Sequence, residues 1–147
     1  MRSKIIQRPS SIRVGVYNGH GSTNTKIRRF ATIYHYIGTA ITYADSPTLG
    51  ASFTINEFGI YAITYNDRFA APSNMGITLN STQLTTNVED VTDKDVLAIN
   101  YEADSQFQVN WTGPLNINDI VRAHTRGLGD FTSGTQAAEY FTIVKCN

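Results

Sequence analysis

The sequence has almost no cysteine, few charges and no long apolar run, and each shortage excludes a class of protein. Its one cysteine, Cys146, is the next-to-last of 147 residues, so no disulfide can form within the chain. No run of eighteen apolar residues is present, which excludes a transmembrane helix. The basic start, MRSKIIQRPSS, has no apolar segment behind it, so no secretory signal is expected. Apolar residues make up 41% and charged residues 16%, which suits one domain with its own core.

Residue patterns that carry catalysis or bind metals are also missing. His20, His35 and His124 are isolated in the sequence and form no HxH or HExxH pair. The acidic loop 89–95 has oxygen ligands that suit calcium, but it lacks the spacing and the central glycine of an EF-hand. A solvated acidic loop is the alternative to a cation site. The sequence therefore predicts no enzyme activity and no cofactor.

The net charge of zero hides an uneven distribution. The first 44 residues contain seven of the 12 Lys and Arg residues and none of the 12 Asp and Glu residues, so this part carries about +7 and the rest about −7. Such polarity indicates a basic segment that meets an acidic surface, on its own oligomer or on a partner. The basic segment could instead fold back on its own acidic body, and nucleic acid would be another acidic partner, although we expect none here.

Strand patterns run through the rest of the chain. The stretch 50–66, GASFTINEFGIYAITYN, alternates around a turn as an antiparallel pair does, and its second half is apolar on both faces. Such a strand is central to a sandwich or packs on a neighbouring subunit. Further strands are expected within 12–17, 26–36, 39–43, 75–79, 80–88, 96–101, 107–111, 120–124 and 139–146. The sequence predicts an all-β, single-domain antiparallel jelly-roll sandwich of eight to ten strands, with no helix.

Three short motifs occur in a recognisable order: Gly59-Ile60-Tyr61, Leu115 to Asp119, and Phe141-Thr142-Ile143. With GSTNTKIRRF at 21–30, this order resembles the C1q/TNF-like jelly roll, in the small form found in bacteriophage virion proteins. The resemblance implies a ten-stranded jelly roll over 21–147, preceded by a basic arm over 1–20, that assembles as a homotrimer. No collagen-like Gly-X-Y stalk is present, so complement or cytokine function is not implied.

The homotrimer needs an interface, and aromatic residues are favoured there. Strands apolar on both faces have more aromatic surface than one sandwich core can bury. The candidate interface residues are Tyr34, Tyr36, Tyr61, Tyr65, Phe107, Trp111 and Phe141.

The resemblance implies a non-enzymatic virion structural protein, made in the host cytoplasm and located on the phage particle surface. We expect a capsid decoration (cement) protein that contacts the major capsid protein or neighbouring virion subunits. We expect no contact with a membrane. The docking candidates are Arg2, Lys4, Arg8, Arg13, Lys26, Arg28 and Arg29. The alternative is a head-fibre or tail-fibre tip that binds a host surface glycan or protein through the loop 125–136. A hydrolase acting on surface polysaccharide is a third possibility, supported only by scattered carboxylates.

Overall fold

The computed structural model describes residues 9–15, 22, 24–126 and 138–147, and for residues 70, 71 and 102–106 the backbone alone. Among these residues, no helix is long and apolar enough to cross a bilayer. The described residues form eight strands and two 3-10 turns, which confirms the all-β prediction. They are β1 Ser11–Gly15, β2 Thr32–Ile37, β3 Ile41–Ser46, β4 Gly50–Ile55, β5 Gly59–Leu79, η1 Val88–Asp90, η2 Asp93–Asp95, β6 Val96–Leu115, β7 Ile120–Thr125 and β8 Tyr140–Lys145.

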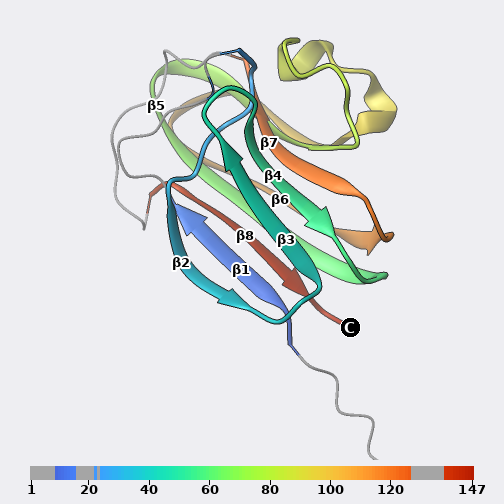
Figure 1. Cartoon of the computed structure of the whole chain (residues 1–147). Coiled ribbons are helices and arrows are strands. Elements are labelled where there is room, and N and C mark those ends of the chain that lie inside the picture. Colours follow the sequence, from blue (N-terminus) through green and yellow to red (C-terminus); the bar gives the residue numbers. More distant parts are fainter. Residues whose placement is uncertain (1–8, 16–21, 23, 127–137) are drawn as a thin grey trace, which may run out of the picture.

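The strands form two layers (Figure 1). The strands β5 and β6 are long enough to take part in both layers. The hydrogen-bonded order is β2-β1-β8-β5-β7-β4-β3, with β6 beside β5. The part of β5 over 61–66 pairs with β8, the part over 75–79 pairs with β7, and the register with β6 is irregular between Phe69 and Met75. We call β2, β1, β8 and the adjoining halves of β5 and β6 the first sheet, and β3, β4, β7 and the other halves the second sheet. If the halves are counted separately, ten strand segments result, as expected for a jelly roll.

The core lies between the two sheets and follows from the alternation along the strands. On β5, Tyr61, Ile63 and Tyr65 point inward and are at most 1% exposed. Phe53 of β4 stacks on Phe141 of β8 with ring centroids 4.6 Å apart, so aromatic rings join the two layers at the centre. Aromatic pairs of this kind add about 0.5–1.5 kcal/mol beyond the area they bury.

The N-terminal boundary differs from the prediction of an arm over 1–20. Residues 11–15 form β1, which lies between β2 and β8 in the first sheet, and Ile12 and Val14 are fully buried. The apolar residues of this strand alternate along the chain, and the free energy gained by burying them outweighs the cost of placing positive charge nearby. Residues 16–20 are outside the described part of the chain, as are residues 1–8. The extended basic arm can therefore include residues 1–8 but not β1.

The segment before β2 is also attached to the sandwich, although it is not the regular strand expected over 26–36. Ile27 forms one isolated bridge with His124 of β7. Lys26 N donates to Leu84 O at 2.7 Å, and Arg28 N donates to Ala123 O at 2.9 Å. These bonds hold residues 26–28 across the end of the second sheet.

Residues 80–95, expected to contain a strand, instead fold over the outer side of the second sheet. The left-handed backbone of Asn80, with φ of 53°, turns the chain out of β5. Val88 and Val91 are then buried at 1% and 4% exposure. Gly76 makes this cover possible, because a Cβ there would lie 2.8 Å from Val88 Cγ2 and 2.8 Å from Ala98 O.

Candidate assembly surface

The two faces of β5 have different roles, and the structure corrects the candidates placed at a subunit interface. Tyr61, Tyr65 and Phe141 are all 0% exposed within a single chain. Their rings fill the sandwich core and cannot contact another subunit. Ile60 and Ala62 lie on the opposite face of β5 and are half-buried. The doubly apolar pattern therefore combines a core face with a second face on the outside of the first sheet.

We define the assembly face as the outward side of the first sheet. Cross-strand pairing places Ala62 opposite Val144 of β8 and opposite Thr112 of β6, and Ser11 of β1 opposite Ile37 of β2. Directly opposite residues share a face. The assembly face comprises Ser11, Arg13, Tyr34, His35, Ile37, Ile60, Ala62, Thr64, Asn110, Thr112, Pro114, Tyr140, Thr142 and Val144.

Local contacts order the β1 side of this face. Arg13 lies over the Tyr140 ring, with its guanidinium carbon 3.9 Å from the ring centroid. Ser11 Oγ lies 2.9 Å from His35 Nε2. A Cβ on Gly15 would come within 2.2 Å of Tyr34, so glycine is what allows the Tyr34 ring to cover β1. Tyr34 is thus half-buried within its own chain, with part of its ring on the assembly face.

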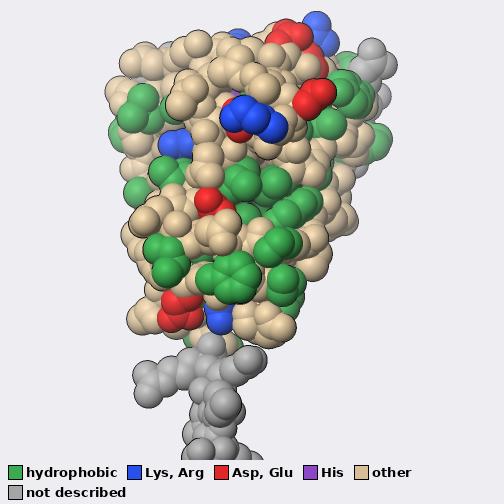
Figure 2. Space-filling model, turned by 90° about the vertical axis from the view of Figure 1, so that its right-hand side faces the viewer, with side chains coloured by type: hydrophobic (Ala, Val, Ile, Leu, Met, Phe, Trp, Pro, Cys, Tyr) green, Lys and Arg blue, Asp and Glu red, His purple; other side chains and the backbone are tan. Residues whose placement is uncertain are grey.

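Large exposed apolar side chains concentrate on the strands that bound the two sheets. Ile33, Tyr36 and Ile37 of β2 are 51%, 42% and 51% exposed, and Tyr101 and Phe107 of β6 are 63% and 39% exposed. Of the expected interface residues, Tyr36 and Phe107 are therefore accessible. The remaining one, Trp111, is partly buried against the core. Hydrophobic side chains also gather, with few charges among them, on the side of the molecule shown in Figure 2.

Charge is sparse on the assembly face. Of the fourteen residues that define it, Arg13 is the one that carries a full charge at neutral pH. A face with apolar and small polar groups and little charge can be buried with a low desolvation penalty.

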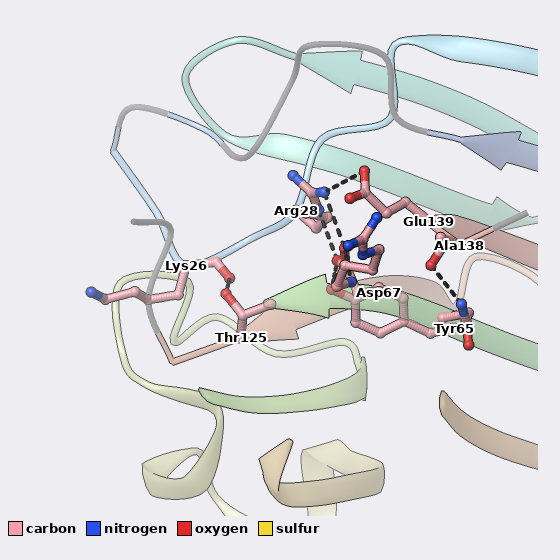
Figure 3. A network of polar contacts seen from close by, with 9 residues as sticks. Lys26, Arg28, Tyr65, Asp67, Thr125, Ala138 and Glu139 are labelled. Carbon is pink, nitrogen blue, oxygen red and sulfur yellow. Dashed lines mark hydrogen bonds and ion pairs between the residues drawn. The ribbon is translucent and has the colours of Figure 1, made fainter. Parts of the chain in front are cut away.

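The cations expected to dock on a partner occupy different environments. Arg2, Lys4 and Arg8 are outside the described residues. Arg13 lies on the assembly face, and Lys26 is half-buried with its side chain directed away from the neighbouring polar network (Figure 3). The guanidinium of Arg29 pairs with Asp45 through two bonds of 2.8 and 3.1 Å, which raises the pKa of Arg29 above its usual value.

Arg28 is the clear correction, because it is fully buried in an ion-pair network (Figure 3). Its Nε donates to Asp67 Oδ2 at 2.8 Å, and its Nη2 donates to Asp67 Oδ1 at 3.1 Å. Nη2 also lies 3.6 Å from Glu139 Oε2, and Tyr65 donates to Asp67 Oδ2 at 2.5 Å. Arg28 therefore stabilises the fold and is not accessible to a partner.

Burial sets the proton affinity inside this network. Desolvation raises the pKa of Asp67 above its usual value, against the opposing effect of the Arg28 cation and the hydrogen bonds. Desolvation also raises the pKa of the Tyr65 hydroxyl well above 10. Asp67 lies outside the strands expected from the sequence, between the stretches 50–66 and 75–79. The available signal was its spacing of two from Tyr65, which puts both side chains on the inward face of one strand.

The acidic loop and the histidines form no metal centre in the described part of the chain, where no group of three or more His, Cys, Asp or Glu side chains comes together. Glu89 pairs with Arg126 at 3.3 Å, and Asp95 pairs with Lys94 at 3.2 Å. His124 is buried beneath residues 80–95, with Nε2 2.7 Å from Thr86 O, and burial lowers its pKa. His20 and most of the loop 125–136 are outside the described residues.

Comparison with known proteins gives a fold but no family. No family model matches the chain, and no curated protein matches it. Among solved structures, bushbaby GITRL is 12% identical with a TM-score of 0.61, covering 94% of each chain. Murine APRIL is 13% identical with a TM-score of 0.59 over 94% of this chain and 99% of that one. Pika GITRL is 12% identical with a TM-score of 0.58 over 96% and 98%.

The fold is a TNF-like jelly roll. At these identities the likeness establishes the fold alone. The expected C1q/TNF-like architecture is thereby confirmed.

Proposed function

We propose that this protein is a homotrimeric, non-enzymatic structural protein whose subunits meet through the assembly face. The observation that carries the proposal is that Arg13 is the one full charge among the fourteen residues that define the assembly face, with Ile60, Ala62 and Val144 at its centre. Exposed Ile37 on β2 extends apolar surface to its margin. A trimer that covers this face would remove this apolar surface from water, and the resemblance to C1q/TNF-like jelly rolls, which implies a homotrimer, supports that arrangement.

The test compares matched substitutions on the outsides of the two sheets. Ala62→Asp places a carboxylate at the centre of the assembly face, and Thr54→Asp places one on the outward side of β4 in the second sheet. Sedimentation equilibrium should show trimers for the wild type and for Thr54→Asp, and folded monomers for Ala62→Asp. Circular dichroism verifies folding. A trimeric Ala62→Asp variant would show that the subunits meet elsewhere.

We further propose that the trimer decorates a phage capsid, with residues 1–8 docking on the major capsid protein or a neighbouring virion subunit. Support comes from the resemblance to phage-type jelly rolls and from the charge of Arg2, Lys4 and Arg8 within one short segment. Three copies of such a segment in a trimer would gain affinity through avidity.

The docking test deletes residues 1–8 and no more, because Ile12 belongs to the core. The shortened protein should remain trimeric and lose its binding to purified capsids, measured as co-sedimentation. Retained capsid binding would refute docking through this segment. Binding to host cells in place of capsids, lost when the loop 125–136 is replaced, would favour the fibre-tip alternative.

A further inference from the structure

A pocket lies beside the first half of β6, at a distance from the assembly face. It has a volume of about 220 Å³. One wall is formed by the 3-10 turns and the other by the strand. The lining residues are Val88, Glu89, Val91, Asp93, Val96, Leu97, Ala98, Ile99 and Tyr101.

The strand wall of this pocket is also an open sheet edge. Residues 96–100 of β6 pair with residues 75–78 of β5, and β5 is the one partner of β6 among the described strands. The backbone groups on the other side of this segment are therefore available to an added strand. Strand addition to an exposed edge provides main-chain hydrogen bonds, and an adjacent pocket provides selectivity for a side chain.

Glu89 defines which side chain the pocket accepts. Its Oε1 pairs with Arg126, whereas Oε2 is buried and has no hydrogen-bond partner among the residues that the structure describes. A buried carboxylate oxygen without a donor costs free energy that a ligand donor would recover. Around Glu89, the valine side chains suit an aliphatic stem. An aliphatic stem that ends in a cation is the side chain of Lys or Arg.

We propose that residues 1–8 of one copy add as a strand to residues 96–100 of β6 in another copy, with a Lys or Arg side chain in the pocket against Glu89. In an extended strand of sequence MRSKIIQR, Arg2, Lys4, Ile6 and Arg8 fall on one face. That face combines positive charge with one apolar group. It complements a pocket of apolar walls with two carboxylates, in a loop that carries four acids over 89–95.

The positions of the two partners favour a contact between copies. Ser10, where the N-terminal segment joins the sandwich, lies at the end that holds the C-terminus, since Lys145 N donates to Ser10 O at 2.9 Å. Residues 88–95 lie at the opposite end of the molecule (Figure 1). The contact is therefore head-to-tail, which links one trimer to the next instead of closing within it. The inference rests on the docking role proposed for residues 1–8, and it names a neighbouring subunit as the partner.

The experiment measures binding of a fluorescent peptide, MRSKIIQR, to the full-length protein by anisotropy, with no capsids present. Glu89→Gln should weaken binding at least tenfold. The matched change Glu57→Gln, in the turn before β5 where Glu57 faces Lys145 at 3.8 Å, should leave binding unchanged. Replacing Arg2, Lys4 and Arg8 of the peptide by Gln should also abolish binding, because the pocket requires a cation.

Strand addition has its own readout. In a strand added to a sheet edge, alternate N–H groups face the edge. Two modified peptides test this prediction. One is N-methylated at Ser3, Ile5 and Gln7, and the other is N-methylated at Arg2, Lys4 and Ile6. One of them should bind to the protein and the other should not. Equal binding of both, equal binding to Glu89→Gln, or no binding of MRSKIIQR would each overturn the inference. Trimer formation and capsid binding are measured separately, so a failure here is distinguishable from a failure of the proposed function.

Discussion

Removing the Arg28 cation should destabilise the fold more than removing the charge of its main partner. Arg28, Asp67 and Glu139 all have side chains that are 0% exposed, so no water can replace a lost partner. Arg28→Met leaves two buried carboxyl groups without the guanidinium between them. Breaking a buried pair from one side costs about 3–5 kcal/mol, and we expect the upper end of this range.

Asp67→Asn should cost less, about 1–3 kcal/mol, which is the scale of hydrogen bonds to a charged group. The reason is that Glu139 Oε2 still lies 3.6 Å from Arg28 Nη2 and keeps a countercharge beside the cation. Arg29→Met is the matched control. Its pair with Asp45 is partly exposed at 28% and 19%, so its loss should cost about 0–1 kcal/mol.

Urea unfolding at fixed protein concentration gives these free energies, with the concentration held constant because an oligomer's stability depends on it. Acidification provides an independent check. Without the guanidinium, the pKa of Asp67 in the folded variant should rise further above its unfolded value. A raised folded pKa gives stability that is lost as pH rises through it, so Arg28→Met should regain about 1–2 kcal/mol relative to wild type between pH 7.5 and 5. Equal costs for Arg28→Met and Asp67→Asn, or no recovery in acid, would refute the reasoning.

Three further predictions concern other parts of the molecule. Burial lowers the folded pKa of His124, so wild-type stability should fall as pH drops below about 6.5, by up to about 1.4 kcal/mol per pH unit, and urea unfolding of His124→Gln should show a smaller slope. Gly76→Ala should cost about 1–3 kcal/mol in urea unfolding, because the added Cβ meets Ala98 O and Val88. Ile12→Ala should cost about 2–5 kcal/mol by the same assay, since Ile12 is fully buried, whereas deletion of residues 1–8 should leave stability unchanged within error.

The β-rich architecture was predictable because alternation along a strand directly reports burial on one face. The hairpin 50–66 illustrates this: its apolar positions Phe53, Ile55, Tyr61 and Ile63 are all in the core. Strand ends were less predictable. Residues 80–88 alternate, yet they fold as a cover with η1, because Gly76 and the partly buried β6 accept Val88 over the sheet. That outcome depends on contacts between residues distant in the sequence, which local alternation does not contain.

The roles of aromatic and basic residues were less predictable for a related reason. The type of a residue indicates whether its side chain prefers to be buried. It does not indicate whether the side chain is buried by its own chain or by another subunit. Tyr61 and Tyr65 were placed at an interface because both faces of their strand are apolar, and the structure shows that the larger side chains take the core face. The smaller Ala62 remains outside with Ile60. The small side chain of Ala62 at the centre of the outer face lets the backbone of a second copy approach closely there.

The charge asymmetry of the sequence is partly balanced inside the fold. Arg28 and Arg29 of the basic third pair with Asp67 and Asp45 of the acidic remainder, so part of the asymmetry is satisfied within the fold. This agrees with the alternative that a basic segment folds back on its own acidic body. The sequence of residues 1–8 contains three further cations, while the loop 89–95 has four acids, with Lys94 within it and Arg126 nearby. Opposite charge on the segment 1–8 and on the loop 89–95 is a reason for copies to associate end to end, and raising the salt concentration should weaken that association more than it weakens the trimer.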